Sequence, residues 1–481
     1  MKISYTALAA SLALLLGGCM VGPDYHRPQV PVAAQYKELP GWTAATPEAG
    51  GAPKGDWWTV FNDPLLNQLE PLVSVSNQTV REDYANYQEA LAEVKVARAS
   101  LFPTIGLTGS GTKQRTASST SNISSFRPIS TSGSAEGNIS WAPDLWGKVR
   151  RTIEENKATA QASQATLANA TLSEQVALAT AVIELRVSDA NIDLLRKTVD
   201  AYTEYLRVVE NQGEAGTAPP SDVITARTQL ENAKASLIAL GIARAQYEHA
   251  IAVLVGKTPE ELNIPYDTTL PTLPTVPVGV PSTLLQRRPD IAVAERQMAA
   301  QNAAVGVAVA AYYPTLSLSA ADGFSQSPLA GLLHLANHVW SVGADVDETV
   351  FDFGARHGEV AAAKAAYEAA VANYRGTVLT AFQNVEDDLS NLRILAQQAE
   401  VLDAAVKDST RGTQIAMNEY QAGTVDYTTA ATAQATQLST EQSALSVHEQ
   451  RLEDTVSLIG DLGGGWSTDQ LGDSKPAASA R

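Results

Sequence analysis

The sequence SLFPT at residues 100–104 returns 211 positions later as AYYPT at residues 311–315. Further pairs follow in the same order, and the separation drifts by only seven residues along the series. They are DLWG at 144–147 with DFG at 352–354, Gly216-Thr217 with Gly423-Thr424, TQL at 228–230 with TQL at 436–438, and LVG at 254–256 with LIG at 458–460. We therefore interpret the chain as two copies of one unit, each reading helix, strand pair, very long helix, glycine-marked break and helix.

Long helical stretches follow the DLWG and DFG motifs in the two copies. From Lys148 to Gln212 there are 65 consecutive residues without glycine or proline, which as one straight helix would extend about 100 Å. The second copy has no proline between Pro328 and Pro476. Because helices of globular proteins seldom exceed about 25 residues, we expect coiled-coil-like or tubular packing. An ordinary coiled-coil rod is the alternative if the helices stand alone.

Four short segments between the helices alternate apolar and polar residues with a period of two. They span about 104–113, 135–143, 315–324 and 341–350, and in the first of them Ile105 and Leu107 alternate with polar residues and glycine. One apolar and one polar face is what an outer-membrane strand needs, with lipid on one side and water on the other. Two ordinary surface hairpins remain the alternative for segments this short.

The strand count predicts the number of copies. A sheet in lipid must close on itself, because an unpaired edge has no water to bond. Four strands cannot close, and eight enclose only side chains or one small ligand. A water-filled duct therefore needs at least three copies and twelve strands. The predicted fold is mostly α with a small membrane β-barrel, a trimeric α/β-barrel duct built from internally duplicated protomers.

The N-terminus indicates export and lipidation. Its apolar stretch Ala7–Leu16 is too short to span a bilayer and predicts a signal peptide over residues 1–18. The sequence LGGC that ends at Cys19 resembles the lipobox of bacterial lipoproteins, so we expect a diacylglycerol and an N-acyl chain on this cysteine, which is the chain's only one. Met20 follows where aspartate would favour inner-membrane retention, which favours the outer membrane of a Gram-negative bacterium.

Composition and motifs exclude several functions. With 52 acidic against 34 basic residues, the chain is not expected to bind nucleic acid. We find no apolar run of about 18 residues after the signal and so expect no transmembrane helix. The six histidines are scattered, and His334 and His338 lack a third ligand for a metal. No catalytic motif occurs in its required context, so we predict that the protein is not an enzyme and has no cofactor besides its lipid.

Several motifs together resemble a known family. They are CMVGPDY at 19–25, WWTVFNDPL at 57–65, DLWGKVR at 144–150 and RRPDI at 287–291. In this order they are similar to TolC-like outer membrane efflux lipoproteins, the NodT branch of the outer membrane factors of resistance-nodulation-division pumps. The resemblance implies a homotrimer with a twelve-stranded barrel in outer-membrane lipid and a long α-helical barrel. It also implies a tip that docks to a periplasmic membrane fusion (adaptor) protein and an inner-membrane drug–proton antiporter.

The predicted domain order follows the duplication. After the signal peptide we expect a lipidated tether and equatorial segment at 19–62. The first repeat then covers 63–270, the second repeat covers 271–466, and a flexible tail occupies 467–481.

The two glycine-marked breaks are the candidate gate. Gly216 and Gly423 supply a permissive backbone where each long helix reverses direction. The resemblance implies that these hairpins form the closed periplasmic end of the tube. It places Asp426 beside the family's constricting acidic ring, Asp222 at an aspartate that ties gate helices together, and Tyr420 at a gate tyrosine. Some relatives have an arginine that pairs with the aspartate at the position of Asp222, and Val425 stands in place of that arginine. An N-cap role for Asp426 is the alternative.

The predicted function is therefore a passive exit duct of a tripartite efflux pump, for drugs or other small toxic compounds. A duct for type I protein secretion and a non-channel periplasmic coiled-coil scaffold remain alternatives. The sequence does not separate drugs, metals, solvents or proteins as cargo.

We predict that Cys19→Ser abolishes labelling of the protein by radioactive palmitate, because the cysteine sulfur is the atom that takes the lipid. Trimers should survive this change, since the barrel itself anchors the protein in the membrane. Labelling that persists in the variant would contradict the lipobox interpretation.

Overall fold

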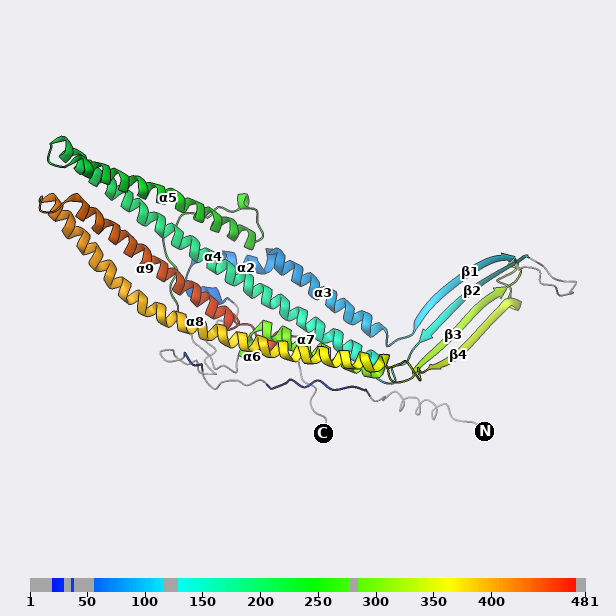
Figure 1. Ribbon diagram of the computed structural model, residues 1–481. Coiled ribbons are helices and arrows are strands. Elements are labelled where there is room, and N and C mark those ends of the chain that lie inside the picture. Colours follow the sequence, from blue (N-terminus) through cyan, green and yellow to red (C-terminus); the bar gives the residue numbers. More distant parts are fainter. Residues whose placement is uncertain (1–19, 30–35, 39–55, 116–128, 277–283, 473–481) are drawn as a thin grey trace. The chain divides into compact units, whose positions relative to one another are not determined.

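The computed structural model describes residues 20–29, 36–38, 56–115, 129–276 and 284–472. The predicted signal peptide, Cys19 and the end of the predicted tail lie outside the described residues. Figure 1 labels the main elements. In chain order they are η1 (Trp57–Phe61), α2 (Pro64–Ser76), α3 (Gln78–Ala99), β1 (Thr104–Arg115), β2 (Ile129–Trp141), α4 (Lys148–Glu214), α5 (Pro220–Leu254), η2 (Pro259–Glu261), α6 (Leu284–Arg287), α7 (Pro289–Ala310), β3 (Thr315–Gln326), η4 (Leu335–Asn337), β4 (His338–Asp347), α8 (Ala355–Gln421), α9 (Tyr427–Asp461) and η5 (Thr468–Gln470).

The chain divides into two compact units, each built from segments of both sequence halves. Unit 1 takes Met1–Pro28, Gln88–Ala162 and Ala294–Tyr374, and unit 2 takes Gln29–Tyr87, Ser163–Val293 and Arg375–Arg481. The units therefore cut across the predicted repeats. The repeat boundaries given above describe the duplication of the sequence and stay a prediction.

The duplication is visible in the helix lengths. α4 and α8 each have 67 residues, and α5 and α9 each have 35. Both helix pairs start 207 residues apart. The pairing of LVG at 254–256 with LIG at 458–460 is wrong, because Gly460 lies inside α9. Gly256 instead matches Gly463, and both have positive φ, 72° and 97°, just beyond their helix ends.

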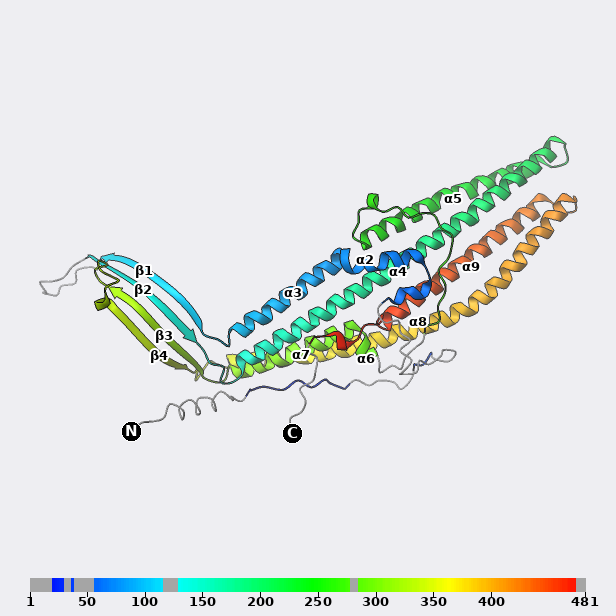
Figure 2. The ribbon, with the colours of Figure 1, turned by 180° about the vertical axis from the view of Figure 1, so that it is seen from behind.

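Unit 1 contains the predicted strands as one antiparallel sheet in the order β1-β2-β3-β4 (Figures 1 and 2). The strand starts differ most for β2 and β4, which begin at Ile129 and His338 rather than near 135 and 341. β4 also ends earlier, at Asp347. Arg356 at the start of α8 binds the two residues that follow the strand, Glu348 at 3.2 Å and the carbonyl of Thr349.

The register places most of the apolar side chains of the four strands on one face. Ile105 pairs with Ile139, which pairs with Ala320, which pairs with Val342. Neighbouring rows repeat this arrangement, with Trp141, Leu318 and Ala344 in one row. These side chains include some of the most exposed large apolar ones in the chain, such as Leu107 and Val342. The sheet thus has the exposed apolar face that a strand in lipid requires.

The opposite face is polar and bonded across strands. The hydroxyls of Thr104 and Ser140 lie 2.8 Å apart, and those of Ser110 and Ser134 lie 2.9 Å apart. The amide of Asn138 donates to the hydroxyl of Thr108 at 2.7 Å. This hydroxyl- and amide-rich face suits contact with water.

Two similar connections, residues 142–147 and 348–354, join strands to long helices, and we call them elbows. Asp144 accepts backbone hydrogen bonds from Val149 at 3.1 Å and Arg150 at 3.0 Å, and it also pairs with the Arg150 guanidinium. In the second repeat Asp352 accepts from Gly354 at 3.0 Å and pairs with the Arg356 side chain at 2.6 Å. Each carboxylate satisfies free N–H groups at a helix start, where the helix dipole also favours negative charge.

The N-terminal tether is bound rather than loose in its described parts. In unit 1 the Arg151 guanidinium, 1% exposed, donates to the carbonyls of Val21 and Gly22 at 3.1 Å and binds Asp24 at 2.8 Å. Gly22 has φ 92°, and a Cβ there would lie 2.4 Å from the Cα of Gly306. In unit 2 the Glu386 carboxylate accepts the N–H groups of residues 37 and 38.

The main core of unit 2 packs η1 and α2 against α4. Asp63 caps α2, accepting from the N–H of Leu65 at 2.7 Å, and Pro64 occupies the first helical position. The buried Arg186 of α4 binds the Asp63 carboxylate at 3.0 Å. Trp57 and Phe61 are fully buried in the same cluster. The helix therefore starts at the boundary predicted for the first repeat, residue 63.

α5 is long and apolar enough, by length and composition alone, to cross a membrane. No such run was expected from the sequence, and this one was missed because its alanines and small aliphatic residues are interrupted by charged ones. Arg244 of this helix binds the fully buried Asp189 carboxylate of α4 at 2.7 Å. That ion pair ties α5 to α4.

Buried Glu70 makes the stability of the fold depend on pH. Its side chain is fully buried on α2, neither oxygen has a partner among the described residues, and burial raises the pKa of its carboxyl to about 9. A raised folded-state pKa means that stability is complete below the unfolded pKa and is lost as pH rises toward 9. The loss is about 1.4 kcal/mol per pH unit between pH 5 and pH 9.

We predict that Glu70→Gln flattens this dependence, because glutamine does not ionise. The measurement is the helix melting midpoint of the detergent-solubilised protein at pH 5 and pH 8.5, for both proteins. Equal falls of the midpoint in wild type and variant would contradict the assignment.

Candidate functional site

The two hairpin turns of unit 2 have the same construction. Gly216 has φ 72° and Gly423 has φ 73°. The N–H of Thr217 bonds the carbonyl of Gln212 at 2.9 Å, and the N–H of Thr424 bonds that of Glu419 at 3.0 Å. These bonds satisfy the free carbonyls at the ends of α4 and α8, while a residue with positive φ reverses the chain. The two glycines therefore lie where the sequence predicted them.

A compact group of side chains joins the two hairpins behind these turns. We call it the hairpin cluster, and its buried members are Val209, Ala226, Met417, Tyr420, Tyr427, Ala430 and Ala431. Tyr420, in the last turn of α8, donates its hydroxyl to the amide oxygen of Gln212 on α4 at 2.5 Å. Its ring meets that of Tyr427 edge-on at 5.3 Å. The contacts between α4 and α8 bring together residues about 200 positions apart.

Tyr427 is the centre of this cluster. It is 1% exposed, and its hydroxyl donates to the amide oxygen of Gln229 on α5 at 3.3 Å. The amide nitrogen of Gln229 in turn donates to the carbonyl of Ala431 at 3.1 Å. The same glutamine therefore connects α5 to α9. Gln212, Gln229 and Tyr427 were not predicted from the sequence. Two of them left a signal: Gln229 lies in the repeated TQL motif, and Tyr427 is an aromatic residue just after the second break.

Asp222 lies near the tyrosines and acts on them electrostatically. It is half-buried in the first turn of α5. Burial and then the charge of Asp222 raise the pKa of Tyr420. Burial, the neighbouring tyrosines and Asp222 raise the pKa of Tyr427 to about 12. Both hydroxyls therefore stay protonated and remain donors at physiological pH. Asp222 thus lies near enough to Tyr420 for its charge to act on the hydroxyl.

Asp426 is the third predicted gate residue. It occupies the N-cap position of α9 with extended backbone, φ −73° and ψ 154°, but its side chain makes no capping bond. Only its carbonyl is used, accepting from the N–H of Thr429 at 3.0 Å. The N-cap alternative is thus right for the backbone and wrong for the carboxylate, which is exposed. Val425, beside it, packs on the hairpin cluster.

The described residues do not bring together any group of three side chains suited to a metal. His338 lies at the start of β4 and contacts the Asp322 carboxylate at 2.8 Å. His334 lies before η4, so the two histidines do not share a helical face.

Acidic side chains of α4 and α9 lie close to one another along the hairpins. Burial, followed by the charges of Glu453 and Glu184, raises the pKa of Glu449 on α9 to about 7. Part of the net charge of −18 is therefore neutralised by protons near physiological pH.

Comparison with known proteins assigns the chain to a family. A model of the outer membrane efflux protein family matches residues 72–257 and 280–464, once for each repeat. The antibiotic efflux pump outer membrane protein ArpC of Pseudomonas putida is 30% identical over 480 residues, covering 100% of this chain and 99% of that protein. The toluene efflux pump outer membrane protein TtgC, also of Pseudomonas putida, has the same identity and coverage.

A solved structure supports the same assignment. The outer-membrane channel OprN superposes with a TM-score of 0.85 at 29% identity, covering 93% of this chain and 100% of that one. A sheet with one apolar face, joined to paired long helices, defines an outer membrane channel with a helical extension. The chain belongs to the outer membrane efflux protein family. The predicted fold class is confirmed, and the protein is the outer membrane channel component of a tripartite efflux pump with periplasmic helices.

We predict that Tyr427→Ala loosens the hairpin ends, because truncating a buried aromatic side chain costs about 3–5 kcal/mol. Hydrogen exchange should quicken at the amides of residues 215–219 and 422–426. Tyr84→Ala is the matched control, since Tyr84 is 56% exposed on α3. Unchanged exchange in Tyr427→Ala, or equal quickening in the control, would contradict the role given to the cluster.

Proposed function

We propose that three copies of the chain close a twelve-stranded barrel and form a passive exit duct without catalytic activity. The observation that carries this proposal is the register of the sheet. It collects the apolar residues of four strands on one face and leaves β1 and β4 as free edges. In lipid such edges must be paired, and four strands of one copy cannot close on themselves. Pairing β4 of one copy with β1 of the next resolves both constraints.

The duct works with two further proteins in this proposal. A periplasmic adaptor protein docks at the hairpin ends, and an inner-membrane resistance-nodulation-division antiporter supplies the energy. Membership of the efflux family supports this assembly. The chain itself offers no site, among its described residues, that could drive transport, so flow through it follows the pump.

The cargo is proposed to be drugs or other small toxic compounds. ArpC and TtgC carry antibiotic and toluene efflux in their names and are equally similar to this chain. Equal similarity to channels for two unlike cargoes indicates that the duct does not select. We therefore assign cargo choice to the antiporter. No observation favours protein secretion, and the sheet with its free edges does not fit a scaffold without a channel.

Two features complete the proposal. Lipid chains on Cys19 hold the mature N-terminus at the membrane, close in sequence to Val21 and Gly22, which Arg151 binds. The hairpin ends form the gate, with Tyr420 and Asp222 in the closure between hairpins. Asp426, exposed and uncapped, supplies a carboxylate that threefold symmetry would repeat around the opening. Such a ring attracts cations.

We predict that Asp426→Ala raises single-channel conductance in planar bilayers and weakens block by multivalent cations about tenfold, or about 1.4 kcal/mol of binding. Asp408→Ala is the control, because Asp408 is exposed on α8 away from the turn. Unchanged conductance and block would remove Asp426 from the gate. Absence of any ion conduction by the wild type would overturn the duct itself.

A further inference from the structure

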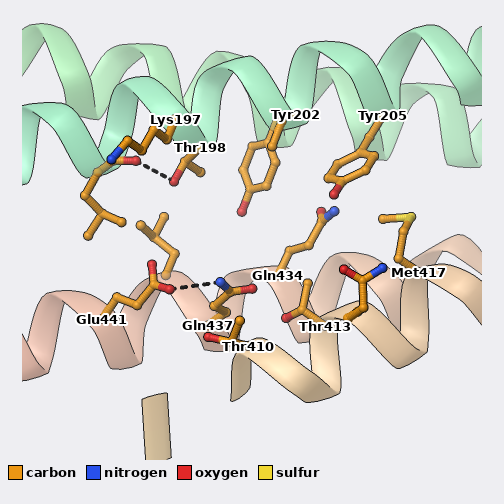
Figure 3. A pocket seen from close by; sticks show the side chains of 14 residues that line it. Lys197, Thr198, Tyr202, Tyr205, Thr410, Thr413, Met417, Gln434, Gln437 and Glu441 are labelled. Carbon is orange, nitrogen blue, oxygen red and sulfur yellow. Dashed lines mark hydrogen bonds between the residues drawn. The ribbon is translucent and has the colours of Figure 1, made fainter. Parts of the chain in front are cut away.

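A cavity of about 510 Å³ lies between the two hairpins of unit 2, beyond the hairpin cluster. α4 forms one wall, and α8 and α9 form the other (Figure 3). Its volume is within the range of small-molecule sites, about 300–1,000 Å³. Its lining is Leu194, Lys197, Thr198, Ala201, Tyr202, Tyr205, Thr410, Thr413, Gln414, Met417, Gln434, Gln437, Leu438 and Glu441.

One polar side chain in this cavity has no partner. Gln434 of α9 is 5% exposed, and neither its amide nitrogen nor its amide oxygen has a hydrogen-bond partner among the described residues. Figure 3 shows its side chain extending from α9 toward Tyr202 and Tyr205 of α4. A buried amide with both groups unpaired destabilises a fold, so such a group is normally satisfied by water or a ligand.

Several of the other polar groups around Gln434 are already bonded. The amide of Gln437 donates to the Glu441 carboxylate at 2.9 Å, and the Thr413 hydroxyl donates to the carbonyl of Ala433 at 3.0 Å. Lys197 pairs with Asp193 at 2.6 Å. Lys197 is therefore paired with a carboxylate and Glu441 is held by a neutral amide, and a neutral guest matches the uncharged amide of Gln434.

We propose that this cavity binds a small, neutral, planar aromatic carboxamide. An amide presents a donor and an acceptor side by side, and the complement that satisfies both is another amide edge. The rings of Tyr202 and Tyr205 and the thioether of Met417 offer the aromatic and polarisable contacts that a flat ring prefers. Nothing in the gate or the barrel uses the Gln434 amide.

Such a ligand touches both hairpins at once, α4 on one side and α8 and α9 on the other. It binds best when the two walls stand at the separation seen here. A ligand stabilises the state to which it binds more tightly, so an occupied cavity holds the hairpins in this arrangement. This consequence rests on the proposed gate, whereas the binding itself does not.

The test uses nicotinamide as the probe and the full-length, detergent-solubilised protein. Saturation-transfer NMR and calorimetric titration should show binding to the wild type and at least tenfold weaker binding to Gln434→Leu. Methyl nicotinate, which keeps the pyridine ring and stays neutral but lacks the amide donor, should also bind at least tenfold more weakly. Gln383→Leu is the control, because Gln383 lies on α8 outside the cavity, and it should bind as wild type does.

A second variant guards against misfolding of the first. Ala201→Leu leaves Gln434 intact but fills part of the cavity and should also abolish binding. The inference is overturned if nicotinamide does not bind the wild type, which would mean a cavity that holds water only. It is equally overturned if Gln434→Leu or Ala201→Leu, folded by circular dichroism, binds as well as wild type.

Conductance separates this inference from the proposed function. Nicotinamide should lower the open fraction of wild-type channels in planar bilayers and leave Gln434→Leu unaffected. Channels that conduct but do not bind the amide would overturn the ligand site alone. Binding without any conduction would overturn the duct and leave the site standing.

Discussion

An unpaired strand edge in lipid is the constraint on which the rest of this structure depends. The sheet is apolar on one face and hydroxyl-rich on the other, and both of its outer strands, β1 and β4, lack a neighbour within the described part of the chain. Backbone groups on those edges have no water to bond inside a membrane. Assembly is therefore a requirement for insertion. The aspartate-capped elbows and the bound N-terminal segment define how the strands join their helices in each copy.

In the proposed gate the helical hairpins face a different constraint, because they must hold together when closed and separate when open. A seam made only of apolar side chains would be stable but would not fix one alignment of the two hairpins. This seam alternates an aromatic cluster around Tyr427, a glutamine link through Gln229, and a cavity beside the unpaired Gln434. Polar groups in such a seam fix one alignment at a cost in stability. That combination suits hairpins that close in one register and open without unfolding.

Much of this architecture could be predicted from the sequence, since it depends on periodicity. The period of two located all four strands, with the largest difference six residues at the start of β2, and glycine located both hairpin turns. The duplication was recognised from short motifs, with one mispairing at Gly460. A three-residue motif can recur by chance close to its true partner, and only the helix ends distinguish Gly460 from Gly463.

The side-chain contacts could not be predicted in the same way. Over a helix of 67 residues a small difference in twist rotates a side chain onto another face. The sequence therefore does not show that the Tyr420 hydroxyl bonds the Gln212 side chain. Nor does it show that the Asp426 carboxylate makes no capping hydrogen bond at the start of α9. The apolar run of α5 was not recognised in the sequence because Arg244 interrupts it. The ion pair between Arg244 and Asp189 is visible only in three dimensions.

The most direct test of the central claim is disulfide cross-linking between the free edges of the sheet. Thr108→Cys on β1 is combined in turn with cysteine at Ser341, Gly343 and Asp345 on β4. Ser110→Cys with Ser134→Cys, whose hydroxyls lie 2.9 Å apart within one chain, serves as the positive control for oxidation. The account predicts that at least one edge pair gives covalent dimers and trimers and nothing larger. A ladder that passes three copies, or no cross-link at any edge pair when the control forms, would contradict it.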